Sequence, residues 1–181
     1  MNYPRSYGQC FYCVGYRSIV GVIQMSKKVV CRALEFLRFL GVAVGIFFAF
    51  WFSGNPEYQF SILTLSVVLS LAGLSGIEGL FFGETSAELS DYSPGSPYQR
   101  ESALNNLALA LATLLVYLVG WGVYAKVTLM SVMLILLILS ALNRAYRVVK
   151  EGDTAPTNYL QPVVTLLLIG FVLPFMINVL V

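Results

Sequence analysis

Residues 58–77 read YQFSILTLSVVLSLAGLSGI and contain no charged side chain. A helix needs about 20 consecutive apolar residues to cross the hydrocarbon core of a bilayer. This stretch therefore predicts a membrane span, and the residue that follows it is Glu78.

The composition shows that the span is not isolated. Of the 181 residues, 58% are hydrophobic and 11% are charged, against about 25% charged in an ordinary soluble domain. A soluble chain of this size cannot bury so much apolar surface. The composition excludes a soluble globular domain and a disordered chain, and its apolar residues suffice for about five spans.

Four further apolar segments flank the first one. The expected spans are at about residues 36–54, 58–82, 98–124, 127–147 and 161–181. Only helices and closed barrels span bilayers, and these lengths are helical. We therefore expect an all-α polytopic bundle formed by one membrane domain at residues 27–181, with a loosely ordered extension at residues 1–26. An interfacial amphipathic helix at residues 27–38 is expected to lead into the first span. An alternative reading joins the third and fourth spans into one re-entrant hairpin.

The placement of Lys and Arg predicts the orientation. Of the 11 such residues, all but Lys126 fall on one side of a five-span chain. Cytoplasmic loops carry this excess of positive charge. We expect the N-terminus to be cytoplasmic, the C-terminus to be outside, and the membrane to be the plasma (inner) membrane.

Small residues predict where helices pack. They recur on one ridge of the second span and form a G-x-x-x-G pair in the first, where they allow close helix approach. These expected packing residues are Gly41, Gly45, Ala72, Gly76, Gly79 and Gly83.

The third span begins with polar residues. Ser96 and Pro97 form a helix-start signature with Gln99, and a polar arc follows them into the span. Such an arc should face protein or water rather than lipid. Interhelical hydrogen bonding and a solute or ion site both remain open as its role. The candidate site residues are Glu78, Tyr98, Gln99, Arg100, Glu101, Asn105 and Asn106.

Glu78 is the acidic residue with apolar span sequence on both sides. An ionisable residue inside a membrane is a functional candidate, although Glu78 is also close enough to the span's end to reach the interface. Its expected partners are Arg100 or the amides of Asn105 and Asn106. If it were buried and unpaired, it would suit a proton-coupled role.

The residues give little indication of metal, cofactor or nucleic-acid binding. The chain has no histidine and a net charge of only +2. Cys10 and Cys13 form a single C-x-x-C, which makes a poor zinc site without further ligands. We expect no metal, no cofactor and no nucleic-acid partner.

The segment Ser96-Pro97-Tyr98-Gln99-Arg100-Glu101, followed by Asn105-Asn106-Leu107-Ala108, resembles a family of small, uncharacterised prokaryotic multi-pass membrane proteins. The resemblance implies a location and a topology but no activity.

Three functions remain open. The first is a non-catalytic accessory or interaction component of a membrane assembly. The second is a small proton-coupled transporter or channel-like protein that uses the polar cluster. The third and weakest is an enzyme acting through Glu84, Glu88, Asp91 and Glu101. Besides the lipid bilayer, the expected partners are further copies of the chain or a larger membrane complex.

Overall fold

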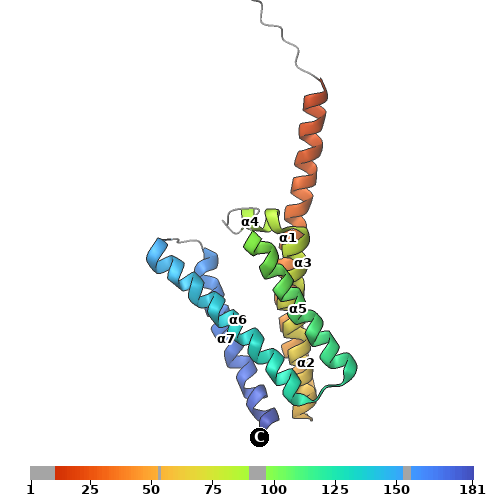
Figure 1. Ribbon diagram of the computed structural model, residues 1–181, viewed down its shortest axis with the longest axis vertical. Coiled ribbons are helices and arrows are strands. Elements are labelled where there is room, and N and C mark those ends of the chain that lie inside the picture. Colours follow the sequence, from red (N-terminus) through yellow and green to blue (C-terminus); the bar gives the residue numbers. More distant parts are fainter. Residues whose placement is uncertain (1–10, 53, 90–96, 153–155) are drawn as a thin grey trace, which may run out of the picture.

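The computed structural model describes residues 11–52, 54–89, 97–152 and 156–181, and the regular structure of this part of the chain is helical (Figure 1). The elements are α1 (Phe11–Trp51), α2 (Pro56–Val68), the π-helical turn η1 (Leu69–Gly73), α3 (Leu74–Phe81), α4 (Gly83–Leu89), α5 (Pro97–Val119), α6 (Val123–Tyr146), the π-helical turn η2 (Arg147–Glu151) and α7 (Pro156–Leu180).

Five segments of the described chain are long and apolar enough to cross a membrane. They are Met25–Trp51, Pro56–Phe81, Tyr98–Val119, Val123–Lys150 and Tyr159–Leu180. Each overlaps one of the expected spans, so the predicted all-α polytopic bundle is confirmed. The third and fourth spans are separate helices of full length, in contrast to the re-entrant alternative.

The spans alternate in direction, which gives the bundle two distinct ends (Figure 1). The links from α3 to α5 and from α6 to α7 lie at one end, with Arg100, Arg144 and Lys150 near it. We call this the basic end. The α5–α6 turn and Lys126 lie at the opposite end, the Lys126 end. The positive-inside rule predicts that the basic end faces the cytoplasm.

The first helix starts earlier than the sequence indicates. Helix α1 begins at Phe11 and continues without a break to Trp51, and its N-terminal part projects beyond the bundle (Figure 1). Residues 11–26 of the expected extension are therefore helical, while residues 1–10 lie outside the described chain. The segment at 27–38 belongs to the same helix as the first span.

Local sequence signals explain two helix starts. The Asn55 side chain caps α2, where its Oδ1 accepts hydrogen bonds from the backbone N–H groups of Glu57 and Tyr58. Helix α5 begins at Pro97, as the sequence predicts, and the expected cap Ser96 lies outside the described residues. Helix α5 ends at Val119, before the predicted Tyr124, because Gly120 turns the chain with a left-handed φ of 72°.

Glycines set the helix contacts on both sides of the second span. Gly41 and Gly45 of α1 lie against Ser70 and Ser66, and a Cβ at either glycine would have no room. The G-x-x-x-G pair thus packs within the chain.

On the other side of the second span, Gly76 and Gly79 lie against the backbone of α5 near Ala103. Gly83 lies beside Gln99, and Ala72 is buried. The predicted small-residue ridge therefore places α5 directly on α3.

The core lies between the helices toward the Lys126 end. Phe60 and Leu63 of α2, Met130 of α6 and Val172 of α7 are in one buried cluster and are fully or almost fully inaccessible. This cluster holds α6 and α7 to the first two spans.

Candidate functional site

A buried ion pair joins the first two spans toward the basic end. The Arg38 guanidinium of α1 pairs through Nη2 with Oε2 of Glu78 on α3. Ser86 Oγ of α4 donates a 2.6 Å hydrogen bond to the other carboxylate oxygen. The side chains of Arg38 and Glu78 are 22% and 9% exposed, so one carboxylate holds α1, α3 and α4 together.

The depth of Arg38 explains why it needs this partner. From Arg38 to Trp51, where α1 ends, the helix rises about 20 Å, which is less than the roughly 30 Å of hydrocarbon core. The backbone of Arg38 therefore lies within the membrane. Helical side chains lean toward the helix N-terminus, which directs the guanidinium toward the basic end and Glu78. Glu78 lies about 33 Å along the second span from Pro56, so the pair is at the edge of the hydrocarbon core. Pairing offsets the cost of burying the charge between the spans.

This partner differs from those that the sequence predicts. We expected Glu78 to contact Arg100 or the amides of Asn105 and Asn106, which lie on the next helix along the chain. Its partners are instead Arg38 and Ser86. The sequence predicts that the first span starts at about residue 36, close to Arg38, whereas that span begins at Met25.

The other candidate residues separate onto different faces of α5. Gln99 Nε2 donates a hydrogen bond to the carbonyl of Gly83, and Asn106 is half-buried. The exposed candidates are Tyr98, Arg100, Glu101 and Asn105. They do not gather around Glu78. Of the carboxylates considered for catalysis, Glu84 is exposed, while Asp91 and the side chain of Glu88 lie outside the described residues.

A pocket of about 320 Å³ lies close to the ion pair, at the basic end. Helices α1, α3, α4 and α5 all contribute to its lining, which includes Lys27, Gln99 and Arg100. The sequence placed Gln99 and Arg100 in the candidate site but gave no sign that Lys27 joins them.

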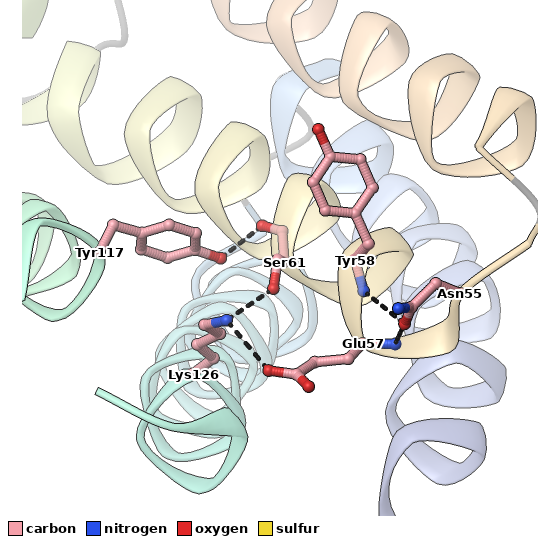
Figure 2. Close-up of polar contacts among 6 residues, drawn as sticks. All are labelled: Asn55, Glu57, Tyr58, Ser61, Tyr117 and Lys126. Carbon is pink, nitrogen blue, oxygen red and sulfur yellow. Dashed lines mark hydrogen bonds and ion pairs between the residues drawn. The ribbon is translucent and has the colours of Figure 1, made fainter. Parts of the chain in front are cut away.

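A second polar cluster lies near the Lys126 end (Figure 2). The Lys126 ammonium of α6 donates a 2.8 Å hydrogen bond to Ser61 Oγ and lies 3.5 Å from a Glu57 carboxylate oxygen. The Tyr117 hydroxyl of α5 donates to the Ser61 carbonyl. Ser61 and Glu78 are separated by about 25 Å of helix, so the two clusters brace the second span near its opposite ends.

The Tyr117 contact gives a first prediction. Replacing Tyr117 with phenylalanine removes a hydrogen bond between spans and should lower the free energy of unfolding by about 1 kcal/mol. Tyr124→Phe is the matched control, because Tyr124 is 75% exposed and should change stability little. Unfolding in mixed micelles measures both. Equal losses in the two variants would show that the Tyr117 hydrogen bond does not stabilise the bundle.

Comparison with known proteins assigns the chain to a protein family. A family of unknown function (DUF6790) matches residues 55–180. No curated protein and no solved structure matches the chain. The matched region starts at the cap of α2 and contains Glu78, Ser86 and Arg100, while Arg38 precedes it. The chain, with its five apolar spans, therefore belongs to this multi-pass membrane family of unknown function.

Proposed function

We propose that this protein is a non-catalytic interaction component of an assembly in the plasma (inner) membrane. It binds its partner through one face of α5, at the basic end of the bundle. The observation that carries the proposal is that Glu101, Ser102 and Asn105 are exposed on a membrane span. We call these three residues the α5 polar face.

The α5 polar face is a single surface, and part of it lies within the membrane. At about 100° per residue, its three residues share roughly 100° of the helix circumference. From Asn105 to the end of α5 at Val119 the helix rises about 21 Å, less than the roughly 30 Å hydrocarbon core. An amide exposed at that depth to lipid alone lacks hydrogen-bond partners, which favours a protein neighbour.

The residues around the α5 polar face suit a helix as that neighbour. Ala108 and Ala112 continue the exposed face one and two turns below Asn105. Small residues let a second helix approach closely enough for the Asn105 amide to reach it. The opposite face is already occupied, because Ala103 and Ala110 are buried toward the second span. The partner is therefore a membrane helix that offers a hydrogen-bonding side chain.

The arrangement of Glu78 supports an interaction role over proton-coupled transport. Its two carboxylate oxygens are engaged within the chain by Arg38 and Ser86, so the carboxylate joins α1, α3 and α4 rather than facing an open path. The neighbouring pocket is lined by residues at the basic end, such as Lys27 and Arg100.

The test replaces one amide on each of two helices. Asn105→Leu should weaken co-purification of the partner about fivefold, since an interhelical hydrogen bond contributes about 1 kcal/mol. Asn143→Leu is the matched control, because Asn143 is exposed on α6. Purification in gentle detergent with size analysis measures both. A full-size complex with Asn105→Leu, or an equal loss with Asn143→Leu, contradicts the proposal.

A further inference from the structure

The pocket at the basic end has the character of a ligand site. It has a volume of about 320 Å³, and its lining combines polar side chains with the apolar Leu80 and Phe81. The polar side chains come from two helices that are far apart in the sequence, Lys27 from α1 and Gln99 and Arg100 from α5. None of these residues belongs to the α5 polar face.

The charges of the pocket favour an anion. Neither Lys27 nor Arg100 makes an ion pair with a residue in the described part of the chain. Glu84, the acidic residue of the lining, is exposed, as are Lys27 and Arg100, so the lining carries two positive charges against one negative charge. A guanidinium presents a planar fork of donors that matches phosphate oxygens, and an ammonium adds a point charge.

The walls of the pocket are held in place without a ligand. Gln99 Nε2 donates to the Gly83 carbonyl, which ties the start of α5 to α4. Ser86 Oγ donates to Glu78, which ties α4 to α3. A preformed site binds with a smaller loss of conformational entropy.

The depth of the pocket points to a lipid. From Pro56 to Phe81 the second span rises about 38 Å, beyond the roughly 30 Å hydrocarbon core and within the 40–45 Å that includes the headgroups. Phe81 is 73% exposed at this level. A phospholipid has a phosphate at the headgroup level and an acyl chain next to it, and this matches cations beside an exposed aromatic ring.

We propose that this pocket binds the phosphate of a membrane phospholipid headgroup. Lys27 and Arg100 bind the phosphate oxygens, and Phe81 contacts the adjoining acyl chain. The positive-inside rule places the pocket on the cytoplasmic leaflet, which is rich in anionic lipids.

The experiment is a titration of the full chain in detergent with phosphatidylglycerol, followed by native mass spectrometry. The first phosphatidylglycerol molecule should bind more tightly than the molecules that bind after it. The pair of changes Lys27→Gln and Arg100→Gln should weaken this binding about tenfold or more, since each basic residue near a membrane surface adds to the attraction. The control pair, Arg144→Gln and Lys150→Gln, removes two cations from the same end outside the pocket and should leave the affinity within about twofold of the parent.

Two further arms identify the source of the phosphate. Diacylglycerol with the same acyl chains should not occupy the site, and inorganic phosphate should not displace the lipid. Equal weakening in both pairs of variants, or tight binding of diacylglycerol, overturns the site. Displacement by inorganic phosphate at millimolar concentration overturns the lipid assignment. An unfolding curve equal to that of the parent confirms that the Lys27 and Arg100 variant is folded.

Discussion

Glu78→Gln is expected to lower the free energy of unfolding by about 3 kcal/mol or more, because it leaves the largely buried Arg38 guanidinium, whose side chain is 22% exposed, without a counter-charge. The two side chains form a largely buried ion pair, and Ser86 donates a hydrogen bond to the other carboxylate oxygen. Reversible unfolding in mixed micelles gives the value directly. Variant protein that still inserts into the membrane should also show this lower free energy of unfolding.

Two controls separate the ion pair from a general effect of removing a charge. Glu57→Gln breaks the pair with Lys126, in which the Glu57 side chain is 58% exposed, and should cost less than about 1 kcal/mol. Adding Arg38→Met to Glu78→Gln should recover much of the loss, because the double variant buries no unpaired charge. Equal costs for Glu78→Gln and Glu57→Gln would show that burial of the Arg38–Glu78 pair does not stabilise the bundle.

Gly76→Ala is expected to lower the free energy of unfolding by about 2 kcal/mol, the usual scale for overpacking a close contact. A Cβ at this position would lie 2.9 Å from the backbone nitrogen of Leu107 and 3.0 Å from the carbonyl oxygen of Ala103. Both atoms belong to the backbone of α5, so relief requires the two spans to move apart.

Gly170→Ala provides the matched control on α7. A Cβ there meets no atom within 4 Å, and alanine has the higher helix propensity, by about 1 kcal/mol. The control should therefore be neutral or slightly stabilising. Thermal unfolding of both variants in the same detergent tests the contact, and a neutral Gly76→Ala would contradict close packing of α3 on α5.

The sequence predicts the spans well because the bilayer sets their length. Apolar runs of the required length occur in five places, and five helices of the described chain fulfil the same requirement. Turn chemistry gives some boundaries as well, as with Pro97 at the start of α5. The end of α5 at Val119 is harder to predict from the sequence, because it depends on the left-handed conformation that Gly120 adopts.

The pairing of charges is harder to predict. Arg38 and Glu78 are in different helices, and their contact depends on where α1 enters the bundle. The charge of Arg38 interrupts the apolar run, so the sequence pattern puts Arg38 close to the start of the first span. The helix in fact continues through it, from Met25 to Trp51. The G-x-x-x-G pair of Gly41 and Gly45, which packs on the second span, is the sequence signal that α1 lies along that span.

The cluster at the Lys126 end was missed for a similar reason. In the sequence, Lys126 indicates the orientation of the chain, and Tyr117 is one of several polar residues along the third span. Neither pattern shows that both reach Ser61. Three helices converge on that residue, and only the packing of α5 and α6 against α2 brings them together.

On the proposed function, the α5 polar face contacts another protein helix within the membrane. Photo-crosslinking in intact membranes tests it most directly, with the reactive group placed at Ser102 and, in a second sample, at Leu166 of α7, which is 69% exposed. We expect a discrete protein adduct from position 102, which is lost when Asn105→Leu is added, and lipid adducts alone from position 166. Lipid adducts alone from both positions would contradict it.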